Sequence, residues 1–309
     1  MCCFSRPTEV SSTQIFARAT APGRQVLVYQ MRYAATQPTA MILPLPVATP
    51  AKETSVTWKN LKDYAGFFAD LQAGFPEKPS SSLFGTKRAA MSVAAAPIEV
   101  HEVGDFVASF VPGVDDFSRL DARFSISKDV WAAIPAYADY GFAVFQLKEL
   151  SGAPHPIAFE WETRLRDSLY FPTVHIHDGT VHANDSFDHV LFFQDAKLDA
   201  RAGDYDGPAS VDPSTKYVRS ASKAATFANA DRALGALDGD LLVHRTALSG
   251  MLPNKDTFVD LASASTRSSL GCGRCELSPS SPRAPLGAGG AALAGLAWII
   301  RRRDALRRA

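Results

Sequence analysis

Four of the seven histidines fall within residues 169–194, a spacing that could bring nitrogen ligands for a metal together. At the centre, Asp178 and Gly179 form a dipeptide typical of a two-residue β-hairpin turn, with strand-like residues on both sides. Side chains alternate between the two faces of a strand. The sequence therefore predicts a hairpin with three histidines on one face, namely His175, His177 and His182.

Three neutral imidazoles on one face could bind zinc or another divalent first-row metal and leave a fourth position open. Histidines also occur on solvated strands without a metal, so a purely structural role is the alternative. His189 lies further along and would join the group if the return strand bends back. The isolated histidines are expected to lie at the surface or to form hydrogen bonds: His101, His155 and His244.

A second candidate for chemistry is Cys2, which offers a free amine beside a thiol if Met1 is removed. N-terminal nucleophile hydrolases use that arrangement, with the amine as base. The opening MC and the segment IFAR at 15–18 resemble the start of the choloylglycine hydrolase group, although Ala21 stands where that group has an Asp. The resemblance implies Cys2 as nucleophile and Arg18 as its contact, which makes an amidohydrolase the alternative function.

Composition excludes some functions and favours a globular body. Acidic and basic residues balance at 32 each, so the net charge gives no general attraction to nucleic acid, and we expect no nucleic-acid partner. Hydrophobic residues make up 46% of the chain, including 19 Phe, which is enough for a buried core. The sequence contains no Gly-rich phosphate loop, GxSxG elbow or HExxH helix.

Strand-like segments with short connections predict a mainly antiparallel sheet, in particular through residues 142–194. Residues 57–75 carry apolar side chains at three- and four-residue spacing, which predicts one prominent amphipathic helix packed on the core. The predicted fold class is therefore α+β.

The C-terminal residues predict a membrane attachment. A Ser, Gly and Pro-rich linker is too polar to bury a core and is expected to be disordered. It leads to an apolar run of about fifteen residues, short of the roughly 20 of a full span, and then to an Arg cluster. The predicted organisation is a globular body at 1–261 with a loop or linker at 76–97, a flexible cysteine-containing linker at 262–285, a membrane helix at 286–300 and an Arg-rich tail at 301–309.

This order of features resembles the myxobacterial C-terminal sorting signal. The matching pieces are GCGRC at 271–275, the Ser/Pro linker, the apolar run at 286–300 and the Arg cluster that follows it. The resemblance implies that the segment anchors and sorts a surface protein. It also implies that Cys272 or Cys275 is the processed or lipidated residue.

The charge asymmetry of the tail gives the same orientation. Arg-rich flanks stay in the cytoplasm, so a span at 286–300 would place the body outside and anchor the chain in the membrane of the cell envelope. The first residues show no signal-peptide pattern, so export implies a translation start upstream of Met1. If translation starts at Met1 and no export occurs, the body is cytoplasmic.

The N-terminal third resembles an uncharacterised family of exported bacterial proteins. The matching pieces are the cysteine pair at 2–3, IFARATAPGRQVLVYQMRY at 15–33 and AMILPLPV at 40–47. The resemblance implies an envelope protein and carries over no catalytic residues. The leading prediction is therefore a surface-displayed, membrane-anchored binding or structural domain, with a metal as a further possibility and no named protein partner.

Overall fold

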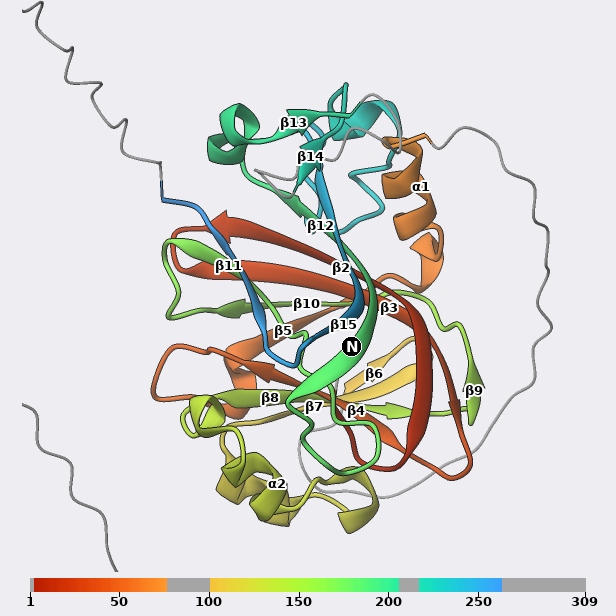
Figure 1. Ribbon diagram of the computed structural model, residues 1–309, viewed down its shortest axis with the longest axis vertical. Coiled ribbons are helices and arrows are strands. Elements are labelled where there is room, and N and C mark those ends of the chain that lie inside the picture. The colour runs from red at the N-terminus through yellow and green to blue at the C-terminus, as the bar shows by residue number, and fades with distance from the viewer. Residues whose placement is uncertain (1–2, 77–100, 206–216, 263–309) are drawn as a thin grey trace, which may run out of the picture. The chain divides into compact units, whose positions relative to one another are not determined.

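The computed structural model describes residues 3–76, 101–205 and 217–262, which belong to one compact unit, residues 1–263. These residues form a mainly β protein with antiparallel and mixed sheets and two short α-helices (Figure 1). The predicted predominance of antiparallel sheet is confirmed, because every strand pair is antiparallel except β12 with β2 and β13 with β14.

Three sheets account for the described strands. In spatial order, the five-stranded sheet contains β1 (Cys3–Phe4), β4 (Ala40–Leu45), β8 (Gly141–Leu147), β7 (Phe106–Val111) and β6 (His101–Val103). The nine-stranded sheet contains β13 (Gly203–Asp204), β14 (Val218–Arg219), β15 (His244–Pro253), β12 (Asn184–Gln194), β2 (Thr8–Ala21), β3 (Arg24–Ala35), β10 (Ile157–Glu162) and β5 (Val56–Asn60), with β9 (Ser151–Gly152) beside β3. The third sheet is the pair β11 (Ser168–Phe171) and β16 (Thr257–Asp260), and the helices are α1 (Phe67–Ala73) and α2 (Lys128–Ala132).

The long hairpin β2–β3 lies at the centre of the nine-stranded sheet, and its middle residues are buried on both faces. On β2, Ile15 and Ala17 belong to one hydrophobic cluster, while Phe16 between them belongs to the other. On β3, Leu27 belongs to the first of these clusters and Val28 to the second. Strands buried on both faces need continuous apolar runs in place of alternation, which explains segments such as VLVY and LFF.

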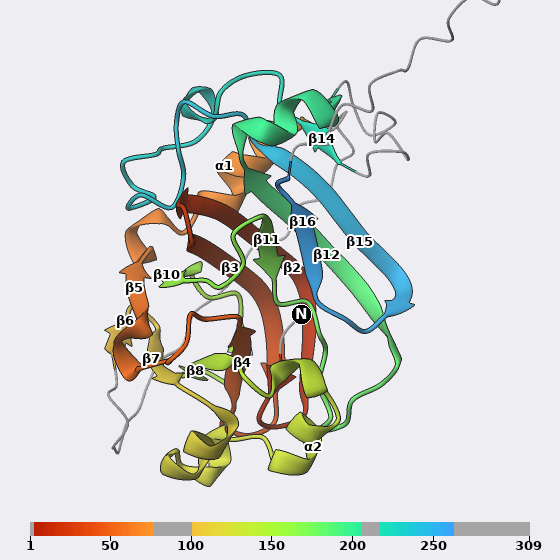
Figure 2. The same ribbon diagram turned by 90° about the vertical axis from the view of Figure 1, so that its left-hand side faces the viewer.

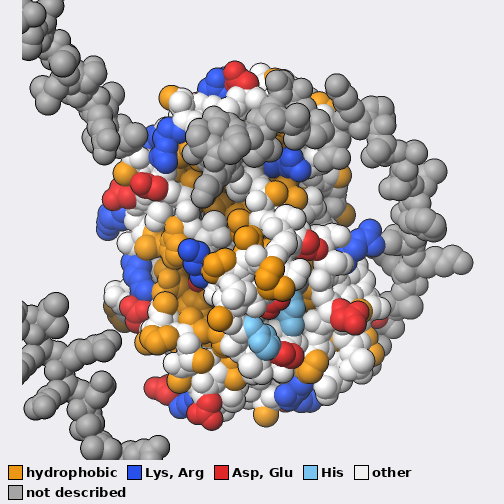
Figure 3. All heavy atoms as spheres, in the orientation of Figure 1, with side chains coloured by type: hydrophobic (Ala, Val, Ile, Leu, Met, Phe, Trp, Pro, Cys, Tyr) orange, Lys and Arg blue, Asp and Glu red, His pale blue; other side chains and the backbone are white. Residues whose placement is uncertain are grey.

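One face of the large sheet packs against the five-stranded sheet, and the other is covered by α1 and by the chain between β14 and β15 (Figures 1 and 2). Phe67, Phe68 and Leu71 of α1 are buried in the second cluster. Hydrophobic side chains also gather on the face crossed by β11 and β16 (Figure 3), where the side chain of Phe258 is 51% exposed.

The predicted amphipathic helix over residues 57–75 is wrong in its first half. Residues 56–60 form strand β5, which pairs with β10 from Val56↔Trp161 to Asn60↔Ile157. Val, Thr and Trp favour a strand wherever a neighbour can pair with it, and this preference exceeds the helical periodicity. The helix is limited to α1 after Gly66, and its apolar side chains form core as predicted.

The predicted pairing of sequential strands through residues 142–194 is also wrong. The segments are strands, but β8 pairs with β4 and β7, and β10 pairs with β3 and β5. β11 pairs with β16, while β12 pairs with β15 and with β2. Pairing satisfies the edges of each strand, and these partners lie far apart in the sequence, where local spacing does not identify them.

Candidate functional site

A cluster of histidines lies against one face of β12. The ring of His175 stacks on that of His177, with centroids 5.0 Å apart and planes at 11°. It also lies 5.2 Å from the ring of His189 and 4.2 Å from that of Phe187, which both belong to β12. We call these four residues the histidine cluster.

Two half-buried side chains from the connection between β15 and β16 hold the segment that carries His175. Asn254 accepts a hydrogen bond from the backbone N–H of His175 at 2.7 Å and donates to its carbonyl at 3.0 Å. The carboxylate of Asp256 accepts from the backbone N–H groups of Thr173 and Val174 at 2.9 and 3.2 Å. The backbone geometry of the cluster therefore depends on residues about 80 positions away in the chain.

The rings of His175 and His177 are neutral at pH 7. Among the described residues, the ring nitrogens of His175 and His189 are buried without a hydrogen-bond partner, and so is Nε2 of His177. The carboxylate of Asp185 lies 3.5 Å from Nδ1 of His175. Burial lowers the pKa of His175 to about 2 and that of His177 to about 4. Both pKa values lie well below the ordinary histidine value, so protonation is costly.

The structure does not form the predicted hairpin, and it replaces one of its three histidines. Asp178 and Gly179 do form a turn, with Gly179 at φ 83° and the Thr180 N–H donating to the Asp178 carboxylate. The flanking residues, however, do not pair with each other. The side chain of His182 is 52% exposed and lies 2.9 Å from the Asp178 carboxylate. His189 takes the predicted place of His182 because β12 is buried on that face.

The predicted metal site is therefore not assembled from His175, His177 and His182. The part of the chain that the structure describes holds no group of three or more His, Cys, Asp and Glu arranged to hold a metal ion. Two stacked imidazole planes do not direct their nitrogens to one point. Zinc binding stays a prediction.

Arg18, the predicted contact of Cys2, bonds to the chain between β14 and β15. Its guanidinium donates to the carbonyls of Gly235 and Ala236 at 2.6 and 2.9 Å and lies 4.0 Å from the Asp238 carboxylate. These bonds attach the chain between β14 and β15 to the large sheet. Cys2 lies outside the described residues, so its contact with Arg18 and the amidohydrolase activity stay predictions.

The predicted processing and membrane residues also lie outside the described ranges. These are Cys272, Cys275 and the apolar run at 286–300. Within 3–76, 101–205 and 217–262, no helix has the length and apolar character needed to cross a bilayer.

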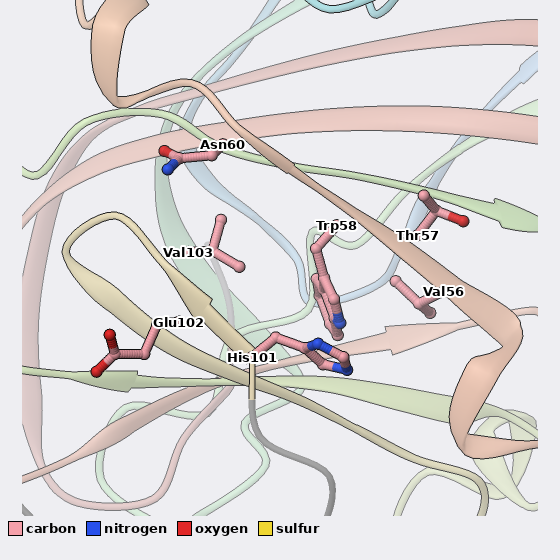
Figure 4. Close-up of a pocket in the computed structure, with 7 residues that line it drawn as sticks. All are labelled: Val56, Thr57, Trp58, Asn60, His101, Glu102 and Val103. Atoms are coloured by element: carbon pink, nitrogen blue, oxygen red, sulfur yellow. The ribbon is translucent and has the colours of Figure 1, made fainter.

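A second feature is an opening of about 400 Å³ between β5 and β6. Each of these strands is the last described strand of its sheet, so one edge of each sheet lines the opening. The rings of Trp58 and His101 lie close together in its lining, with centroids 6.2 Å apart and planes at 44° (Figure 4). The lining residues are Val56, Thr57, Trp58, Asn60, His101, Glu102 and Val103.

Trp58 is fixed by aromatic contacts to both sheets. Its ring packs edge-on against Phe145 of β8 at 5.4 Å and lies 5.8 Å from Phe159 of β10. Each aromatic pair at such a distance stabilises the fold by about 0.5–1.5 kcal/mol beyond the free energy of burying its surface. The indole is therefore held rigidly at the bottom of the opening.

The buried ring of His155 holds the β6–β7 turn, and with it the β6 edge. Its Nε2 accepts a hydrogen bond from the Asp105 N–H at 3.0 Å, while Nδ1 donates to the Pro156 carbonyl at 2.9 Å. Gly104 has φ 61°, and a Cβ there would collide with the His155 ring. Burial lowers the pKa of His155, which keeps the ring neutral and Nε2 able to accept. The expectation that His155 is a hydrogen-bonded histidine is confirmed.

Sequence reasoning missed this opening because it assigned Trp58 to a helix. The strand preference of VTW was the available signal. No local pattern could show that the edges of two different sheets lie side by side.

The fold and the site define a mainly β protein in which an edge of each of two sheets lines one opening. No family model and no curated protein matches the sequence. Among solved structures, the chain is similar to baculovirus P35, at 16% identity and a TM-score of 0.44 over 84% of this chain and 99% of that one.

Two further structures of that protein are similar to the chain. P35 in its complex with caspase-8 gives 15% identity and a TM-score of 0.41 over 81% of this chain and 96% of that one. A mutated P35 after caspase cleavage gives 15% identity and a TM-score of 0.42 over 81% of this chain and 99% of that one. Similarity at this level carries no argument about function, which follows from the residues of this chain.

The histidine cluster predicts a loss of stability in acid. Below pH 6.5 the unfolded chain binds protons at His175 that the folded chain does not, so stability present at neutral pH is lost as the pH falls. Between pH 7 and pH 5 we expect His175 alone to lower the free energy of unfolding by about 2 kcal/mol. Urea titrations at pH 7, 6 and 5 measure this loss.

The matched variants are His175→Phe and His182→Gln. Phe keeps the packing against Phe187 and cannot be protonated, so we expect a smaller acid loss than in the wild type. The pKa of the exposed His182 is raised by its bond to Asp178, so the Gln variant should keep the loss or increase it. An unchanged pH dependence in His175→Phe would show that this ring does not titrate on unfolding.

We expect His155→Phe to loosen the β6 edge. The change keeps the contact with Phe106 and removes both ring hydrogen bonds, leaving the Asp105 N–H without its acceptor, at a cost of about 1–3 kcal/mol. Amide exchange over residues 101–106 should accelerate. The control is Lys62→Met, which removes a half-exposed ion pair to Asp105 worth at most about 1 kcal/mol. Equal exchange rates in wild type and His155→Phe would refute this role of the ring.

Proposed function

We propose that the body is a binding domain that takes an extended peptide at the opening between β5 and β6. The observation that carries this proposal is that an edge strand from each sheet lines an opening with a fixed indole inside it. An edge strand presents backbone N–H and C=O groups on its outer side, and an extended peptide can add to it as another strand.

The lining residues supply the selectivity that backbone pairing lacks. Trp58 offers an aromatic surface for an apolar side chain of the peptide, and Val56 and Val103 extend it. Thr57, Asn60 and Glu102 add hydroxyl, amide and carboxylate groups at the rim. Rigid aromatic anchors in partly desolvated pockets contribute most to peptide affinity. The expected ligand is therefore an extended segment with at least one large apolar residue.

A peptide selection on the full chain tests this function. Randomised peptides displayed on phage are selected on the immobilised protein, and an enriched peptide is titrated by calorimetry. We expect Trp58→Leu to weaken binding about tenfold or more, because Leu keeps the contact with Phe159 but loses most of the aromatic surface.

The control for this experiment is Phe258→Leu, the same kind of change at a 51% exposed aromatic residue on β16. It should leave the affinity unchanged. Failure to enrich any peptide, or equal affinity for Trp58→Leu and wild type, would count against a peptide site at this opening.

We also propose that the body is displayed outside the cytoplasm and anchored to the membrane of the cell envelope. What supports this is the sequence of the C-terminal segment, where an apolar run at 286–300 is followed by Arg301, Arg302 and Arg303. Guanidinium groups resist transfer through a bilayer, so this flank is expected to stay on the cytoplasmic side.

Protease treatment of intact cells, with mass spectrometry of both termini, tests the display. We expect the body to be cleaved in intact cells and the mature C-terminus to map to Cys272 or Cys275. A full-length chain found soluble in the cytoplasm, tail included, would exclude anchoring.

A further inference from the structure

One edge of β15 is uncovered over residues 247–253, as far as the described strands extend. Its other edge pairs with β12 along the whole strand, from His244↔Phe193 to Pro253↔Asn184. On the uncovered side, β14 pairs only with the first two residues of β15. Figure 2 shows β15 at the margin of the sheet.

The uncovered stretch is long and carries no charge. Residues 247–253 are Ala, Leu, Ser, Gly, Met, Leu and Pro. Ala247 and Ser249 are exposed, and the side chain of Met251 is 71% exposed. Pairing with β12 continues through Gly250 without a register shift, although its φ is 84°. The stretch is therefore a continuous, uncharged edge.

Other described edges are short or charged. β6 has three residues and includes Glu102, and β13 has two and includes Asp204. β5 carries Lys59, whose ammonium lies 3.4 Å from the Glu160 carboxylate. Short strands and charged side chains are the usual protection of a sheet edge against pairing with another chain. The edge of β15 over residues 247–253 is neither short nor charged.

We propose that the uncovered edge of β15 pairs with the same edge of a second copy of this chain. A two-fold axis makes the two strands antiparallel and joins the two large sheets into one. Both sides then present the same uncharged stretch, so no charge loses its water and no like charges face each other.

A second copy suits this edge better than a free peptide does. β15 is already ordered by β12, so two copies pair without losing the conformational entropy that a flexible peptide loses on binding. The proposal is independent of the peptide site, which lies at the other end of the strand order of the same sheet.

The test is the oligomeric state of the full chain in detergent, measured by size-exclusion chromatography with light scattering over a range of concentrations. We expect a dimer for the wild type. Ala247→Lys and Met251→Lys each place a cation beside the new pairing, and we expect at least about tenfold weaker dimerisation. The control is Leu150→Lys, a change at a 47% exposed leucine between β8 and β9, which should remain dimeric.

Amide exchange locates the contact without relying on variants. Exchange over residues 247–252 should slow with rising concentration in the wild type and not in Met251→Lys. A monomer at every concentration, a dimer that both lysine variants retain, or concentration-independent exchange at β15 would each overturn the proposal. A monomer that instead binds an extended peptide on β15 would overturn it as well.

Discussion

The burial of β2 and β3 on both faces is the constraint on which the rest of the structure depends. Each buried apolar side chain on these strands faces one of two separate clusters, and full burial of each large one stabilises the fold by about 1.5–3 kcal/mol. Two layers are needed to cover the two faces. The five-stranded sheet provides one, and α1 with the chain between β14 and β15 provides the other. Arg18 attaches that chain to the sheet.

This architecture concentrates the available backbone groups at the margins. Interior strands have both edges paired, so unpaired backbone groups lie on the end strands, among them β5 and β6, and on the part of β15 beyond β14, as far as the described residues show. These edges differ in chemistry. β5 and β6 combine charges with a rigid indole, whereas β15 is uncharged over seven residues. The structure thus offers one margin suited to selective binding and one suited to a copy of itself.

The buried histidines pack against aromatic rings or bond to polar groups of the fold. Among the described residues, His155 satisfies both ring nitrogens and fixes a turn, while His175 and His189 leave theirs without partners in an aromatic environment. His244 stacks on Phe193 with Nε2 3.1 Å from the Asp199 carboxylate. Sequence spacing correctly placed His175 beside His177, and it included His189 only on the condition that the return strand bends back.

The sequence by itself determined the turn at Asp178-Gly179, the strands within residues 142–194 and the apolar side chains that form the core of α1. These are local properties, because turn conformation and side-chain periodicity depend on adjacent residues. Only the tertiary structure decided that residues 56–60 form a strand, that β12 pairs with β2 and β15, and that His189 replaces His182. Strand partners come from distant parts of the chain, and no local pattern encodes which partner each strand takes.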